Sequence, residues 1–218
     1  AWDGTANSNP LKARLAEPVA ALRGWDLRFG AESIPTSVAI AYGDTLLSQI
    51  GDAADQAGVG VYDYMAAGAS AAVKLGALAD AVTRLEEDFG SWATPWGEIN
   101  RFQRLTGDIV QPFDDEGASV PVGFTSARWG SLAAYGQRTF NGTKRIYGTR
   151  GNSFVAVVAF GDSVRARAVS AGGQSGDPSS PHFADQIERY ATGDLRTVRF
   201  YRPDVDAVAE ETYRPGGR

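Results

Sequence analysis

The sequence predicts an α+β fold, with helices in its N-terminal half and strands in its C-terminal half. Up to about residue 90, apolar side chains recur every three or four positions, the spacing of one helix face. From about residue 107, Gly, Ser and Pro separate short β-branched and aromatic runs, as in strands joined by turns. We therefore expect a mainly helical lobe over 1–106 and a β-rich segment with short C-terminal helices over 107–218.

Three helices are predicted in the first lobe. The first follows the Ser/Asn pair before Pro10 and continues to Gly24, with a perturbation at Pro18. The second follows Ser33, and its apolar residues recur every fourth position: Val38, Tyr42, Leu46 and Ile50. The stretch 51–69 is ambiguous, because two glycines interrupt it. The strongest helical pattern comes next, with apolar residues at Leu75, Leu78, Val82, Leu85 and Phe89.

The second half predicts a hairpin. Its first arm, FVAVVAF over 154–160, is apolar throughout, which is typical of a strand covered on both faces. After the turn residues GDS, the second arm, VRARAV, alternates apolar residues with arginine. We expect a helix over HFADQIERYATG, a strand over LRTVRFY and a last short helix at Pro203.

Composition excludes several functional classes. The chain has 218 residues, of which 43% are hydrophobic, so it can bury a substantial core. A net charge of −5 provides no overall basic field, which argues against nucleic acid and anionic membranes as partners. The longest apolar run is far shorter than the ~20 residues of a membrane helix. The absence of cysteine excludes disulfides and thiolate metal sites and permits an oxidising compartment.

Ser175, His182 and Asp185 pose the question of a compressed hydrolase triad. A nucleophile elbow, G-x-S-x-G, would need glycine at position 177, which is aspartate. Ser175 and His182 could still meet across the turn, but the stretch alone supplies neither a held base nor oxyanion donors. We favour a glycine-rich turn, with Ser180 and Pro181 opening a helix that carries His182, Asp185 and Gln186.

Other chemistry has weaker support in the sequence. One histidine without cysteine cannot complete a zinc site. The acidic run 114–116 lacks the spacing of a calcium loop and predicts a solvated turn. Trp92 and Trp96 stand near Glu98, Asn100 and Arg101, which could form a polar network or border a ligand pocket. We favour the network, because buried polar groups need partners with or without a ligand.

Several motifs together resemble a known family. They are WGEINR at 96–101, the segment GNSFVAVVAFGDSVRARAVSAGGQSGDPSSPHFADQIERYATGDL at 151–195, the closing YRPG, and the earlier LRGWDLRFGAESIPTSVAIAYGDTL at 22–46. This set is similar to the C-terminal part of the β subunit of penicillin acylase-type N-terminal nucleophile (Ntn) amidohydrolases, closest to acyl-homoserine lactone and aculeacin acylases. The matching residues that we expect to be structural are Trp96, Gly97, Glu98, Arg101, Gly173, Gln174, Ser175, Gly176, Pro181, His182, Asp185 and Gln186.

The resemblance implies a mechanism whose catalytic residues lie outside this chain. In the family, a serine exposed by self-cleavage starts the β subunit, and its own α-amine acts as the base. Those positions lie upstream of Ala1, and the methyl group of Ala1 has no nucleophilic atom. We therefore expect no catalytic residue, no metal and no cofactor here; the resemblance permits a calcium ion in the intact enzyme, with its ligands outside this chain.

The same resemblance implies partners and a location. The partners would be the α subunit and the N-terminal part of the β subunit, with which this chain would complete an αββα sandwich. In isolation the chain should leave an apolar face or sheet edge uncovered and could self-associate. The resemblance also implies a periplasmic or secreted protein.

Two other hypotheses stay open. The first is a non-catalytic binding or scaffold domain that diverged from acylases. The second is a self-sufficient serine hydrolase that uses Ser175 and His182, which a Ser175→Ala variant would test.

Overall fold

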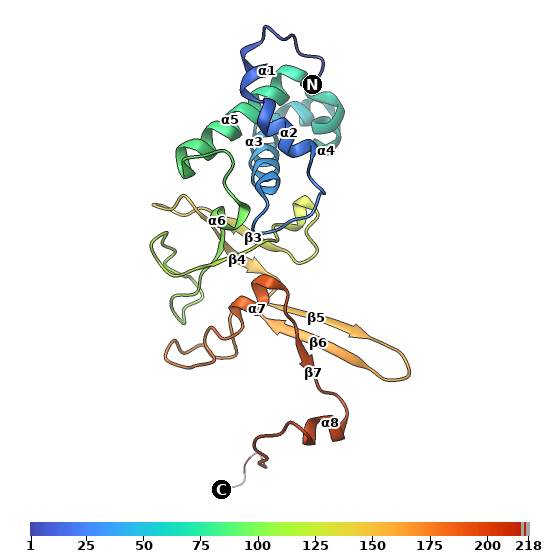
Figure 1. Cartoon of the computed structure of the whole chain (residues 1–218), viewed down its shortest axis with the longest axis vertical. Helices are drawn as coiled ribbons and strands as arrows, with labels where there is room; N and C mark the ends of the chain where they lie inside the picture. The colour runs from blue at the N-terminus through green and yellow to red at the C-terminus, as the bar shows by residue number, and fades with distance from the viewer. Residues whose placement is uncertain (215, 217–218) are drawn as a thin grey trace. The chain divides into compact units, whose positions relative to one another are not determined.

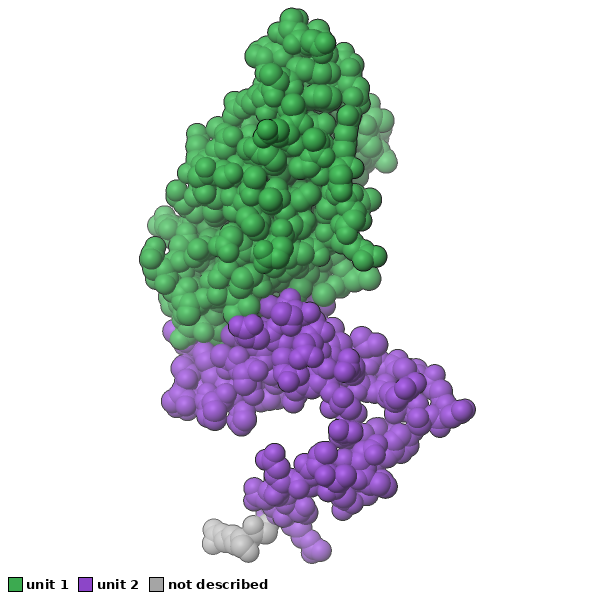
Figure 2. Space-filling view, in the orientation of Figure 1, with its two compact units in different colours: residues 1–105, 112–151 green, residues 106–111, 152–218 purple. Residues whose placement is uncertain are grey.

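The computed structural model describes residues 1–214 and 216, so Pro215 of the closing YRPG motif lies outside the described residues. It confirms the α+β class, with helices first and two small sheets after them (Figure 1). The described chain forms two compact units (Figure 2). Unit 1 contains residues 1–105 and 112–151, and unit 2 contains 106–111 and 152–218. The division at residue 106 that we inferred from composition stays a prediction.

The first predicted helix is two helices, α1 (Pro10–Arg14) and α2 (Ala16–Arg23). Asn9 caps α1, because its side chain accepts a hydrogen bond from the Leu11 N–H at 2.9 Å. The break follows from Pro18, whose ring would clash with the carbonyl of the residue four positions earlier, Arg14. The perturbation thus occurs one turn before the proline, at Leu15, which is fully buried.

Two long helices build the core of unit 1. Helix α3 (Ile34–Ala57) is capped by Ser33 and ends at Gly58, whose φ of 66° is left-handed. Helix α5 (Ala71–Phe89) is capped by Ser70 and ends at Gly90, with φ 80°. Between them lie the short α4 (Val61–Asp63) and the π-helix η1 (Tyr64–Gly68), in the stretch that the sequence left ambiguous. The predicted apolar stripe of α5 is buried at Leu75, Leu78, Val82 and Leu85 and packs on α3.

The helical core continues into a four-stranded sheet in unit 1. The short helix α6 (Trp96–Ile99) leads directly into β1 (Asn100–Phe102). The other strands are β2 (Val120–Pro121), β3 (Tyr135–Arg138) and β4 (Ile146–Gly151), in the order β2-β1-β4-β3. Strands β1 and β4 are parallel, and the other two pairs are antiparallel. A 3₁₀ helix, η2 (Ala127–Trp129), connects β2 to β3.

Unit 2 contains the predicted hairpin. Strands β5 (Phe154–Ala159) and β6 (Arg165–Ser170) are antiparallel, with Phe154 opposite Ser170, and β7 (Arg196–Val198) pairs with the other edge of β6. The short helices α7 (Ile187–Thr192) and α8 (Arg202–Asp206) flank β7 in the sequence.

The sheet of unit 2 exposes apolar side chains. The expectation that β5 is covered on both faces is not met within the described chain. Large apolar residues on or beside the strands are 44 to 85% exposed: Phe154, Val157, Val158, Phe160, Val198 and Phe200. Burial of such side chains would contribute about 1.5–3 kcal/mol each.

The predicted helix over residues 182–193 is wrong in its first half. Helix α7 begins only at Ile187, and His182 to Gln186 form turns before it. The reason is that the carbonyl oxygen of His182 accepts a hydrogen bond from the Ser175 N–H at 3.1 Å, and Gly173 packs against the same backbone. These contacts hold residues 182–186 outside helical geometry.

Among the described residues, no single helix has the length and apolarity needed to cross a membrane. One pair, residues 61–68 with α5, meets those two criteria jointly, but the pair is bent by 108°.

Candidate functional site

The WGEINR motif forms the junction between helix and sheet in unit 1. Trp96 is 2% exposed and belongs to the helical core. Gly97 donates its N–H to the carbonyl of Ala31 at 2.7 Å. A Cβ at position 97 would lie 2.8 Å from Cβ of Pro121 and 2.9 Å from Cβ of Ala31. The glycine is therefore required by close packing of three chain segments.

Asn100 is the polar centre of this junction. Its Nδ2 donates to the carbonyls of Val122 and Phe124, both at 2.8 Å, and its Oδ1 accepts from the Tyr135 hydroxyl at 2.6 Å. Asn100 is fully buried. One side chain thus joins β1 to the segment after β2 and to β3, so we expect its replacement to be costly.

Arg101 binds backbone rather than a carboxylate. Its Nη1 donates to the Gly97 carbonyl at 2.9 Å, and its Nη2 and Nε donate to the carbonyl and hydroxyl of Ser119. Burial, followed by the nearby charge of Arg145, lowers the pKa of Arg101. Glu98 is exposed. Asn100 and Arg101 therefore form a polar network of the kind that we favoured, while Trp96 and Ile99 of the same motif also border a cavity of about 440 Å³.

The second motif, residues 173–186, is a loop of unit 2 that closes on itself. A Cβ on Gly173 would lie 2.1 Å from the His182 carbonyl oxygen and 2.8 Å from that of Phe183. Gln186 is 2% exposed, accepts the Ser170 N–H at its side-chain oxygen and donates its own N–H to Gly172. The loop is thereby attached to the end of β6.

Ser175 and His182 meet through their backbones. The Ser175 hydroxyl oxygen accepts the N–H of Asp177 at 3.1 Å. The His182 ring pairs with Asp185, Nδ1 to Oδ2, at 3.1 Å, and its side chain is 67% exposed. A catalytic base in a hydrolase is shielded from solvent, whereas this histidine–aspartate pair is largely exposed. This geometry favours a turn over a triad.

The remaining motif residues surround this loop. Gln174 donates its Nε2 to the Ser170 hydroxyl at 3.1 Å. Gly176 and Pro181 are exposed, and a Cβ on Gly176 would meet nothing within 4 Å. Asp177 accepts two hydrogen bonds from Ser179, which lower its pKa. The two motifs belong to different units.

Asp115 has a structural role that was not predicted from the sequence. The acidic run was expected to be a solvated turn, but Asp115 accepts the Lys144 N–H at 2.7 Å and the Tyr147 hydroxyl at 2.8 Å. Burial and this carboxylate raise the pKa of Tyr147. Nothing in the local sequence around Lys144 and Tyr147 identifies Asp115 as their partner. In the part of the chain that the structure describes, no cluster of three metal-ligating side chains occurs.

A model of the penicillin amidase family matches residues 4–207, which includes both units and both motifs.

Proposed function

Because the chain belongs to the penicillin amidase family, we propose that it is a structural portion of an amidohydrolase that cleaves acyl–amide bonds. Its partners are the α subunit and the N-terminal part of the β subunit, and the nucleophilic serine is supplied from a part of the enzyme N-terminal to this chain. The proposed substrates are amides that join an acyl group to a homoserine lactone or a β-lactam nucleus.

One observation carries the structural half of this proposal. The β5-β6-β7 sheet exposes six large apolar side chains at 44 to 85% of their surface. A patch of this kind on a small sheet marks an interface with another protein layer. In an αββα sandwich both faces of each sheet are covered, and the remainder of the enzyme would supply that cover.

The chemistry follows from the family resemblance. The serine hydroxyl attacks the amide carbonyl while its own α-amine takes the hydroxyl proton and passes it to the leaving amine. Water then hydrolyses the acyl-enzyme ester and releases the carboxylic acid. Donors to the oxyanion come from the same remainder of the enzyme. This chain contributes the scaffold behind that site, and the enzyme is periplasmic or secreted.

A reconstitution experiment tests the proposal. The chain is mixed with the separately produced remainder of the enzyme, and release of amine from an acyl-homoserine lactone or a penicillin is measured. We expect turnover from the mixture and none from this chain alone. Ser175→Ala in this chain should keep the turnover of the mixture, whereas alanine at the nucleophilic serine of the other part should abolish it.

A surface variant tests the sheet as the contact. Val158→Asp should weaken assembly with the remainder at least tenfold, because it places a charge in the apolar interface. The matched control is Leu132→Asp in unit 1, where the leucine is 99% exposed and assembly should be unchanged. Turnover by this chain without companion, lost on Ser175→Ala, would favour the serine hydrolase hypothesis. Assembly without turnover would favour a non-catalytic scaffold.

A further inference from the structure

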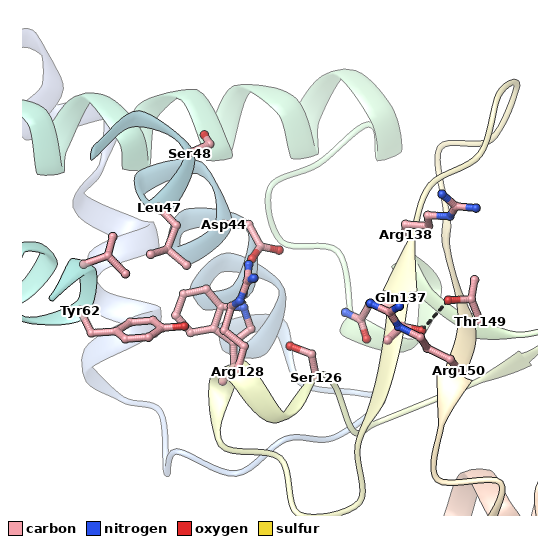
Figure 3. Close-up of a pocket in the computed structure, with 13 residues that line it drawn as sticks. Asp44, Leu47, Ser48, Tyr62, Ser126, Arg128, Gln137, Arg138, Thr149 and Arg150 are labelled. Atoms are coloured by element: carbon pink, nitrogen blue, oxygen red, sulfur yellow. Dashed lines mark hydrogen bonds between the residues drawn. The ribbon is translucent and has the colours of Figure 1, made fainter. Parts of the chain in front are cut away.

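Unit 1 contains a cavity of about 1000 Å³ that is lined neither by the WGEINR motif nor by the loop 173–186 (Figure 3). Its walls come from helix α3, α4, η2 and strands β3 and β4. One part of the wall is apolar or aromatic, with Leu47, Val61, Tyr62 and Trp129. The volume is at the upper end of the range for small-molecule sites, about 300–1,000 Å³.

The rest of the wall is basic. Arg128, Arg138 and Arg150 line the cavity, against a single carboxylate, Asp44. In the described chain, the guanidinium groups of Arg128 and Arg150 have neither a hydrogen bond nor an ion pair, and that of Arg138 lies 4.6 Å from the ring centre of Phe140. Two guanidinium groups thus remain available for an anion, in a protein whose net charge is negative.

Close packing holds both sides of the cavity in place. The Trp129 ring lies over Gly43, where a Cβ would be 2.7 Å from the ring, and its Nε1 donates to Asp44 at 3.0 Å. The Arg150 stem lies over Gly136, where a Cβ would be 2.9 Å from Cγ of Arg150. The aromatic wall and one arginine are therefore positioned before a ligand arrives, which lowers the entropic cost of binding.

We propose that this cavity binds a small organic anion, a carboxylate or phosphate group carried on an aromatic or short alkyl body. The anionic group would accept hydrogen bonds from Arg128 and Arg150, since a guanidinium presents parallel N–H donors that match two anionic oxygens. The apolar body would lie against Tyr62 and Trp129. Gln137 Oε1, buried at the wall without a hydrogen-bond partner in the described chain, is available to a donor group on the ligand.

Binding of three matched probes to the full chain tests the proposal. Benzoate, phenyl phosphate and neutral benzamide are titrated up to about 10 mM, the range of weak small-ligand affinities, and binding is followed by calorimetry. We expect both anions to bind at least tenfold more tightly than benzamide. Relative affinity for benzoate and phenyl phosphate distinguishes a carboxylate ligand from a phosphate ligand. Absence of binding by both anions, or equal binding of benzamide, would overturn the proposal.

Three variants locate the site. Arg150→Gln should weaken anion binding at least fivefold, and Gly136→Ala should weaken it without changing charge, because the added Cβ displaces the arginine stem. Asp44→Asn should tighten binding, since it removes the one carboxylate but keeps an acceptor for Trp129. The control is Arg202→Gln in α8 of unit 2, which removes the same charge outside the cavity and should leave affinity unchanged. Circular dichroism verifies that each variant is folded. Equal losses in Arg150→Gln and Arg202→Gln would contradict the proposal.

Discussion

Ser175 donates its backbone N–H to the carbonyl oxygen of His182 across 3.1 Å, so the two residues of the apparent triad are joined as parts of a turn. The serine hydroxyl oxygen accepts from the backbone of Asp177, and the imidazole pairs with Asp185. Each polar group thus stabilises the loop locally. The serine, histidine and aspartate that suggest nucleophilic chemistry are therefore explained by the hydrogen bonds that a tight, glycine-rich loop needs.

Gly173→Ala should destabilise unit 2. The new Cβ would lie 2.1 Å from a backbone oxygen that cannot move without breaking the Ser175 hydrogen bond. We expect a loss of about 1–3 kcal/mol in the free energy of unfolding, as for other overpacked sites. Gly176→Ala is the matched control, because a Cβ there meets nothing within 4 Å and should change stability by less than about 0.5 kcal/mol. Urea denaturation of both variants measures the difference, and equal losses would contradict the packing argument.

Asn100→Ala should be among the most destabilising polar substitutions in unit 1. It removes three buried hydrogen bonds, to Val122, Phe124 and Tyr135. We expect a loss of about 2–4 kcal/mol, whereas Tyr135→Phe, which removes one of the three, should cost about 1–2 kcal/mol. In the double variant the shared bond is lost only once, so the two losses should sum to more than the measured total. Strict additivity would show that the bond contributes nothing.

Two glycines of α3 should respond in opposite directions to alanine. Gly43→Ala places a Cβ 2.7 Å from the Trp129 ring and should cost about 1–3 kcal/mol. Gly51→Ala meets nothing within 4 Å and should stabilise the helix by about 0.5–1 kcal/mol. Thermal denaturation of both variants is sufficient to see the opposite signs. A stabilising Gly43→Ala would show that the indole can move away at no cost.

Tyr190 should make the protein sensitive to alkaline pH. Burial raises its pKa to about 12, from an ordinary value of 10.0, and the side chain is 4% exposed. The folded state holds the phenolic proton more tightly than the unfolded state does. The free energy of unfolding therefore keeps the full contribution of Tyr190 below pH 10 and declines as the pH rises from 10 towards 12. The decline is bounded by about 2 to 3 kcal/mol.

The phenylalanine variant isolates that contribution. Tyr190→Phe keeps the ring and removes the ionisable group, so it should reduce the fall in unfolding free energy above pH 10, while the part due to Tyr147, whose pKa is also raised, remains. The control is Tyr213→Phe, at a ring that is 76% exposed. If both variants follow the same alkaline curve as the parent chain, ionisation of Tyr190 has no part in the loss of stability.

Local rules were sufficient for the long elements. The three-and-four spacing of Leu75 to Leu85 predicted the buried face of α5, because helix periodicity is contained in one segment of chain. The break before Pro18 follows from the steric reach of one ring. The hairpin of β5 and β6 was likewise predictable, since its arms are joined by turn residues and their apolar pattern matches strands.

Features that depend on residues far apart in the sequence could not be predicted from local sequence rules. The helix predicted from His182 begins at Ile187, because the His182 carbonyl is bound by Ser175 and packed against Gly173. Asp115 was predicted to be solvated, but a hydroxyl and backbone N–H groups near residue 145 bind it. In both places a contact between separated residues outweighed the local preference.

The sequence by itself determined the α+β class, the long helices and the two family motifs, since each depends on residues close together in the chain. Only the tertiary structure decided that Ser175 and His182 form a turn, that Asn100 joins three segments and that Arg128 and Arg150 share a cavity with Asp44. The physical reason is that burial and electrostatic fields depend on distance in space, and one sequence contains no direct measure of that distance.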